Sequence, residues 1–286
     1  MRVQKAVITA ASPGQRSLPL QNIVDRDGQP KTALQLILDE AVAAGIREIC
    51  IVICPGDAPR YRQAACEHSG HLTFVEQDSP RGYGDALLRA AGFVEDEPFL
   101  HLVGDHLYIS GNELGCAQQL IQLAQAEDCA VSAVQSTREH QLHLFGTVGG
   151  VRVAHSPGLY EITKVIEKPT PTFAEQELVV AGLRSSHYLC LFGLHVLTPT
   201  VMELLREQLG QAEQTGQNIS LSPALNRLAE RERYLAAEIE GKRFNIGVKY
   251  GLLMSQLALA LSGKDRDDIL TQLLELVASH REVATS

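Results

Sequence analysis

A loop rich in small residues follows the first apolar run of the chain. Residues 10–19 read Ala-Ala-Ser-Pro-Gly-Gln-Arg-Ser-Leu-Pro. The backbone of such a loop can approach a ligand closely, and Arg16 can meet a phosphate. Open α/β sheets bind ligands at the carboxyl ends of their strands. The segment therefore predicts a phosphate-binding loop, with an ordinary Gly/Pro turn as the alternative.

A second segment, residues 76–86, follows a strand-like run and opens a helical one. The amide of Gln77 can donate and accept hydrogen bonds in one plane, which suits the edge of a nucleobase. Gly82 and Gly84 leave room for a flat ring. The pattern predicts base recognition, and a helix start after a tight turn is the alternative reading.

An acidic side chain ends the apolar run of residues 99–103, because Asp105 comes two positions after it. Mg²⁺ takes few protein carboxylates and completes its shell with water and phosphate oxygens, so one carboxylate at a sheet mouth suits phosphoryl chemistry. Asp105 is the predicted metal ligand. The alternative is an Asp that caps the loop. His106 receives no role.

These segments require a scaffold of alternating strands and helices. Strand-like and helical runs alternate through the first half, as in βαβ units of a parallel sheet covered by helices: residues 3–9, 32–44, 48–54, 72–77, 84–93, 98–103, 115–126 and 130–135. From about residue 146 strands follow one another without intervening helices, which predicts a β-rich insertion beside the main sheet at 146–198. Helices return at 200–209, 223–231 and 247–261.

The last helical run, residues 266–281, carries an apolar stripe. We expect this helix to dock on the domain's own core, and a subunit contact is the alternative. There is no internal repeat or long linker, so the expected organisation is one domain over 1–286, with terminal helices at 247–282.

Composition excludes several function classes. The 286 residues are 45% hydrophobic and 21% charged, as in a folded globular domain. A net charge of -9 argues against a nucleic-acid partner. No run approaches the roughly 20 apolar residues of a membrane span, and the first residues lack a signal peptide. Six cysteines in apolar surroundings predict buried, reduced thiols, and with them a cytoplasmic protein.

The order of these motifs resembles the sugar-1-phosphate nucleotidyltransferases, closest in layout to the bacterial glucose-1-phosphate uridylyltransferases. Their signature Gly-x-Gly-Thr-Arg-x-x-Pro is matched at Gly14, Arg16 and Pro19, whereas Ser12 and Gln15 differ from it. Gln77 precedes a Gly-x-Gly-x-Ala run, as it does in the family. Further matches are the aromatic-Gly-x-Val element at 145–148, Glu-Lys-Pro at 167–169, and elements resembling the family's at 191–199 and 219–225.

The resemblance implies a Rossmann-like, mixed and mostly parallel sheet with helices on both faces. It also implies the transfer of a nucleotide from UTP to glucose 1-phosphate, which gives UDP-glucose and pyrophosphate with Mg²⁺ as cofactor. The implied catalytic residues are Arg16, Asp105 and Lys168, and the implied metal ligands are Asp105 and Asn245. The implied substrate-binding residues are Ala11, Ser12, Gly14, Gln77, Gly82, Asp105, Gly146, Glu167 and Lys168. In this reading Glu167 accepts hydrogen bonds from sugar hydroxyls while Lys168 meets the sugar phosphate.

Two positions depart from the family pattern. Asn245 stands where the family has a second metal-binding Asp, which removes a charge from the metal site. Residues 20–30 hold no Lys where the uridylyltransferases carry lysines, and Arg26 is the only cation there. A catalytically impaired nucleotide-sugar-binding protein is therefore the second hypothesis, and a homo-oligomeric state is an open alternative under either hypothesis. A dinucleotide-dependent oxidoreductase is disfavoured because the first loop lacks three spaced glycines.

Overall fold

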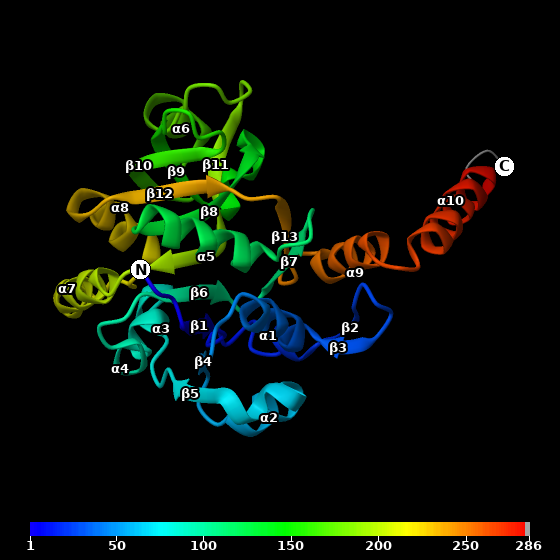
Figure 1. Ribbon diagram of the computed structural model, residues 1–286, viewed down its shortest axis with the longest axis horizontal. Coiled ribbons are helices and arrows are strands. Elements are labelled where there is room, and N and C mark those ends of the chain that lie inside the picture. Colours follow the sequence, from blue (N-terminus) through cyan, green and yellow to red (C-terminus); the bar gives the residue numbers. More distant parts are fainter. Residues whose placement is uncertain (284–286) are drawn as a thin grey trace.

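A computed structural model of the chain describes residues 1–283, and the side chains of all of these except 71, 213–215 and 280–283. Its centre is a mixed nine-stranded sheet with helices on both faces (Figure 1), which confirms the expected fold class. The strand order is β5 (Leu72–Glu76), β4 (Glu48–Ile53), β1 (Lys5–Thr9), β6 (Phe99–Val103), β11 (His187–Leu197), β8 (Ala130–Arg138), β12 (Tyr234–Glu238), β10 (Leu159–Glu167) and β9 (Gly146–Arg152).

The parallel part of the sheet is built around β1. This strand pairs in parallel with β4 and β6, and β4 pairs in parallel with β5. All five residues of β1 are buried, because Ala6 and Ile8 pack on one face of the sheet while Val7 packs on the other. Strand β11 runs antiparallel to β6 and β8 and joins this part to the rest. The carboxyl ends of β1 and β6 therefore open side by side.

Helices α1 (Ala33–Ala43) and α5 (Cys116–Glu127) cover one face of the sheet. Helices α3 (Tyr83–Arg89), α7 (Thr200–Thr215) and α8 (Leu221–Arg231) cover the other. Helix α1 begins where predicted because Thr32 and Gln35 form a reciprocal capping box that satisfies two free backbone N–H groups. The shorter helices are η1 (Leu18–Leu20), α2 (Ala58–Ala64), η2 (Cys66–His71), α4 (Ala91–Val94) and η3 (Glu139–Leu144).

The β-rich segment differs from its prediction in two ways. Strands β9, β10 and β11 belong to the main sheet rather than to an insertion beside it. A helix, α6 (Pro171–Glu177), also lies between β10 and β11, where we expected none. Thr170 starts this helix because its side chain accepts a hydrogen bond from the backbone N–H of Phe173.

Two small antiparallel sheets were not predicted. One pairs β2 (Asn22–Val24) with β3 (Pro30–Thr32), and the other pairs β7 (His106–Ser110) with β13 (Gly241–Asn245). The second sheet sets Asn245 opposite His106 in register, although 139 positions separate them (245 − 106 = 139). It therefore ties the carboxyl-terminal part of the chain to the mouth of β6.

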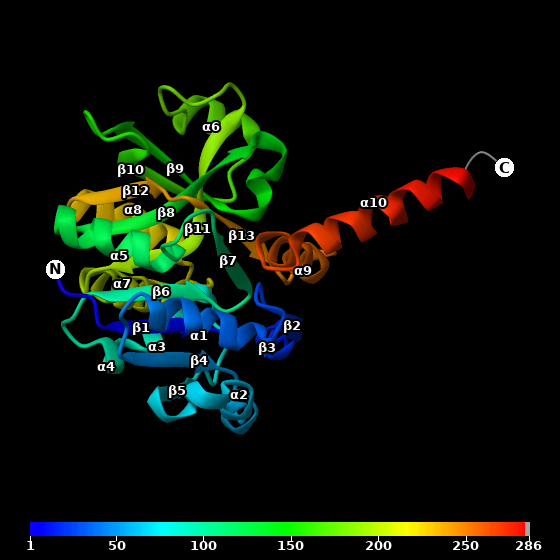
Figure 2. The ribbon, with the colours of Figure 1, turned by 45° about the vertical axis from the view of Figure 1, so that its right-hand side comes forward.

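The last two helices are α9 (Gly251–Ser262) and α10 (Arg266–Val283). Helix α10 projects away from the body of the molecule (Figure 2), so the expectation that it docks on its own core is wrong. It packs against α9, and its stripe stays in solvent, with Leu274 62% and Val277 58% exposed. No helix within residues 1–283 has the length and apolar character needed to cross a bilayer. All six cysteines are free thiols, and all are buried except Cys66.

Candidate functional site

A cavity of about 470 Å³ lies at the carboxyl ends of β1 and β6, where ligands of open α/β sheets bind. Its walls come from parts of the chain that are far apart in sequence: the loop after β1, the start of α3, the loop after β6, the turns around 145 and 167, the middle of β11, and the start of α8. The predicted site residues that line it are Ala11, Ser12, Gln77, Gly82, Asp105, Gly146, Glu167 and Lys168. Gly14, Arg16 and Asn245 do not line it.

The loop after β1 holds Arg16 away from the cavity. The guanidinium forms an ion pair with Asp57, whose side chain is buried, and the Tyr61 hydroxyl donates to the Arg16 carbonyl oxygen at 2.8 Å. The partnership with Asp57 raises the pKa of Arg16. Gln15 and Pro19 line the cavity in its place. In this structure Arg16 therefore does not reach a ligand in the cavity.

The start of α3 forms the wall on the side of Gln77. Nε2 of Gln77 donates to Asp85 Oδ2 at 2.6 Å and to the Gly82 carbonyl at 3.2 Å. Gly82 adopts φ 111°, and a Cβ there would lie 2.3 Å from the carbonyl oxygen of Ile219. Only glycine fits this position, because any side chain would collide with the backbone of Ile219.

Asp105 lies where β6 ends, with its side chain on the cavity wall. Oδ1 of Asp105 is 2.8 Å from Nδ1 of His106, and the Asp105 carbonyl accepts a hydrogen bond from the backbone N–H of Ile246. A carboxylate on the cavity wall with one oxygen held suits Mg²⁺, which binds one or two protein carboxylates plus phosphate oxygens. The donor set therefore fits a magnesium ion through Asp105.

The second predicted metal ligand, Asn245, does not line the same cavity as Asp105. Asn245 lines a neighbouring cavity, and its Oδ1 accepts a hydrogen bond of 2.7 Å from the backbone N–H of Gly247. The β7–β13 pairing brings the backbones of the two predicted ligands together, but their side chains line different cavities.

Glu167 and Lys168 line another part of the cavity wall. Glu167 accepts a hydrogen bond from the Ser222 hydroxyl, and the Lys168 backbone N–H donates to the Phe145 carbonyl at 3.1 Å. Lys168 has φ 47°, a left-handed conformation that is unfavourable for a side chain with a Cβ. Within the described residues, Lys168 is the one Lys or Arg on the cavity wall. The loop conformation thus presents a single ammonium group to the cavity.

Sequence reasoning missed a pair of buried histidines beneath the cavity. His101 and His195 stack with ring centroids 5.8 Å apart, and His195 lines the cavity. The Val7 carbonyl can only accept, so Nδ1 of His101 donates to it at 3.0 Å and Nε2 accepts from the Tyr83 hydroxyl. Burial lowers the pKa of His101 to about 4. The available signal was a histidine within an otherwise apolar strand.

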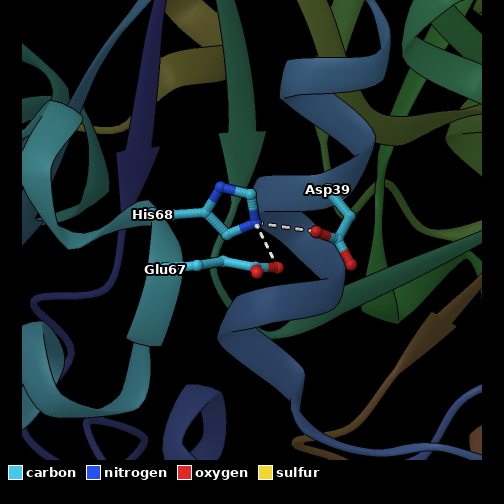
Figure 3. A group of neighbouring side chains, drawn as sticks. All are labelled: Asp39, Glu67 and His68. Carbon is cyan, nitrogen blue, oxygen red and sulfur yellow. Dashed lines mark hydrogen bonds and ion pairs between the residues drawn. The ribbon is translucent and has the colours of Figure 1, made fainter.

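A group of side chains with metal-ligand chemistry lies outside the cavity. Asp39, Glu67 and His68 come together between α1 and η2 (Figure 3). Nε2 of His68 is 2.7 Å from Asp39 Oδ1, while the Lys31 ammonium is 2.7 Å from the other oxygen of Asp39. The Lys31 cation competes with a metal for this carboxylate, so we interpret the group as an ion-pair network.

Comparisons with known proteins bear on the family and the fold of the chain. The sequence model of a family described as nucleotidyl transferase matches residues 19–242. The UTP–glucose-1-phosphate uridylyltransferase 2 of Streptococcus pyogenes serotype M3 is 29% identical, and the uridylyltransferase of Streptococcus pneumoniae serotype 4 is 28% identical. Each match covers 96% of this chain and 96% of the relative. The UTP-bound structure from Acinetobacter baumannii superposes with a TM-score of 0.73 over 96% of this chain and 100% of that chain, at 22% identity. This last likeness concerns the fold.

Proposed function

Because the chain belongs to the nucleotidyl transferase family, we propose that it joins UTP to glucose 1-phosphate to give UDP-glucose and pyrophosphate. Its relatives named for this reaction support a sugar-1-phosphate nucleotidyltransferase, and they favour UTP and glucose 1-phosphate among the substrates of that class. The observation that carries the proposal is that one cavity is lined by Asp105, by Gln77, and by Glu167 with Lys168.

In the proposed reaction a phosphate oxygen of the sugar phosphate attacks the α-phosphorus of UTP. A new P–O bond forms while the bond from the α-phosphorus to the bridging oxygen breaks, and pyrophosphate leaves with that electron pair. Positioning and charge neutralisation dominate this chemistry. A magnesium ion held by Asp105 would supply positive charge to the phosphates.

The protein's own residues divide the remaining tasks. Gln77 and Gly82 bind the base, and the backbone around Ala11 and Ser12 lies close to the phosphates. Ser222 holds one oxygen of Glu167, and the other lies 3.8 Å from the Lys168 ammonium. In the proposal this second oxygen accepts from sugar hydroxyls while Lys168 meets the sugar phosphate. Arg16 joins the triphosphate only if it leaves Asp57, so its proposed catalytic role requires a movement of the loop after β1.

The second candidate is a catalytically impaired nucleotide-sugar-binding protein. Its support is the scarcity of positive charge around the cavity, where Lys168 is the sole Lys or Arg of the described wall. Arg26 does not compensate, because its loop between β2 and β3 lies against the end of α9, with its carbonyl accepting from the Lys264 backbone N–H. Each lost charge-stabilising group costs about a hundredfold in rate.

Pyrophosphate release from purified protein with Mg²⁺ distinguishes the two candidates. Nucleoside triphosphates are combined with sugar 1-phosphates in a matrix, and Asp105→Asn serves as the inactive control. Release that is fastest with UTP and glucose 1-phosphate supports the enzyme. UDP-glucose binding without release from any pair supports the second candidate, and neither binding nor release contradicts both.

A further inference from the structure

A second cavity of about 250 Å³ lies beside the first, between the end of β8, η3 and the start of α9. It shares the wall formed by Leu144 and Phe145 with the first cavity. Its described lining contains two cations, Arg243 and Lys249, and no carboxylate. A concave surface with two positive charges and no acid attracts anions.

Arg243 is a partly buried cation that has no acidic partner among the side chains that the structure describes. Its guanidinium lies 3.7 Å from the centre of the Phe145 ring and donates to the Leu191 carbonyl oxygen. Buried charges in proteins are normally paired, so the missing partner needs an explanation.

A polar group on the same cavity also lacks a partner. The Oε1 atom of Gln135 is buried without a hydrogen-bond partner among the described residues. Gln141 lines the same cavity, and its amide can donate to an anion.

We propose that this second cavity binds a small phosphate-bearing anion through Arg243 and Lys249, and that the first cavity responds to its binding. A planar guanidinium and a flexible ammonium match the oxygens of a phosphate, which neutralises both charges. Binding of the anion does not depend on the proposed function of the first cavity. The response of the first cavity to it does.

The response passes through residues that touch both cavities. The Arg243 guanidinium lies over the ring of Phe145 and donates a hydrogen bond to the carbonyl oxygen of Leu191. Both Phe145 and Leu191 line the first cavity. The Phe145 carbonyl also accepts the backbone N–H of Lys168. An anion that draws the guanidinium toward itself therefore changes the contacts that hold the Lys168 loop.

Calorimetric titration with inorganic phosphate tests the binding. We expect Arg243→Gln and Lys249→Gln to weaken phosphate binding roughly tenfold, the effect of losing a hydrogen bond to a charged group. Lys242→Gln is the matched control, since Lys242 precedes Arg243 on β13 and does not line the cavity. If Arg243→Gln does not fold, Lys249→Gln still tests the proposal, because Lys249 is exposed and its replacement does not disturb the core.

A fourth variant, Lys168→Gln, identifies the cavity that is occupied. Loss of phosphate binding in Lys168→Gln alone would place the anion in the first cavity and overturn the proposal. Equal phosphate affinities in the wild type, Lys249→Gln and Lys242→Gln would overturn it as well. Neither result depends on nucleotide turnover, so neither is confused with a failure of the proposed function.

The dissociation constant for UTP, measured with and without phosphate, tests the response. We expect a change of about fivefold or more in the wild type and in Lys242→Gln, a size typical of coupling between sites. Lys249→Gln should lose this change while it still binds UTP. The same change in all three proteins would mean direct competition in the first cavity and would overturn the coupling. A protein that binds phosphate but no UTP contradicts the proposed function alone.

Discussion

Asp85 fixes the orientation of Gln77 by accepting a hydrogen bond of 2.6 Å from its Nε2. The Gly82 carbonyl accepts from the same nitrogen, so the amide nitrogen has two acceptors and the carbonyl oxygen remains for a ligand. Asp85 is buried and also lies 3.4 Å from Arg81 and 3.2 Å from Arg89. A carboxylate held in this way cannot turn to release Gln77.

This orientation predicts selection among pyrimidine bases. Uracil carries an N–H at N3 that can donate to Gln77 Oε1, whereas cytosine has an acceptor there. In Asp85→Asn the new side-chain NH₂ can donate to Oε1, which allows the Gln77 amide to reverse. We expect the preference for UTP over CTP to fall roughly tenfold, the scale of one mismatched hydrogen bond to a buried polar group.

The ratio of kcat/KM for UTP to that for CTP measures this preference, and calorimetric affinities replace it if turnover is slow. Asp39→Asn is the control, because Asp39 is paired with Lys31 and lies outside the cavity. An unchanged ratio alongside a lower melting temperature would assign Asp85 a purely structural role.

The left-handed conformation of Lys168 predicts that this residue lowers the stability of the protein while its ammonium group contributes to substrate binding. Lys168→Ala and Lys168→Gly both remove the ammonium group, so both should raise the KM for the sugar phosphate more than that for UTP. Glycine tolerates φ 47° whereas alanine does not, so the glycine variant should be about 1 kcal/mol more stable than the alanine variant. Urea denaturation measures the difference, and equal free energies of unfolding would show that the loop is not strained.

Asn245→Asp tests the second predicted metal ligand. The carboxylate can keep the hydrogen bond to the Gly247 N–H with one oxygen while its added charge attracts a cation. If this position faces the ion, the Mg²⁺ concentration at half-maximal activity should fall roughly tenfold, comparable to one strong charge interaction. An unchanged Mg²⁺ dependence would leave Asp105 as the sole protein ligand.

The buried His101 predicts a loss of stability in mild acid. Its pKa is lowered from 6.5 to about 4, so between these values the unfolded chain binds a proton that the folded chain does not. This contribution is complete above pH 6.5 and is lost as the pH falls toward 4. The neighbouring His195, whose pKa is lowered by burial and by His101, acts in the same direction.

Free energies of unfolding from urea titrations between pH 7 and pH 5 measure this loss. In His101→Gln the decline should be shallower, because one titrating group is gone. An identical slope in the variant would mean that other groups, and not His101, cause the acid sensitivity.

The exposed stripe of α10 predicts a homo-oligomer. Leu274→Glu combined with Val277→Glu should lower the mass measured by light scattering, because charge then replaces apolar surface at the contact. The melting temperature of the body should stay unchanged, since the main described contact of α10 is with α9. Gln272→Glu is the control on the same helix. A wild-type protein that is monomeric at all concentrations would contradict the prediction.

Local patterns determined the scaffold and part of the cavity wall. Apolar runs with capping residues, such as Thr32 before α1, place strands and helices because these preferences act over a few neighbouring residues. Parallel strands bring their carboxyl ends to one edge, so Gln77 and Asp105 could be assigned to the same cavity from sequence. The family resemblance added Glu167 and Lys168, which no local pattern links to that edge.

Tertiary structure decided the contacts between distant segments. Pairing of β7 with β13 places Asn245 beside a second cavity, and the ion pair with Asp57 holds Arg16 away from the first. An amphipathic stripe shows that α10 has an apolar face, but it does not show what covers that face. A sequence pattern records which side chains avoid water, whereas partners far along the chain depend on how the whole backbone packs.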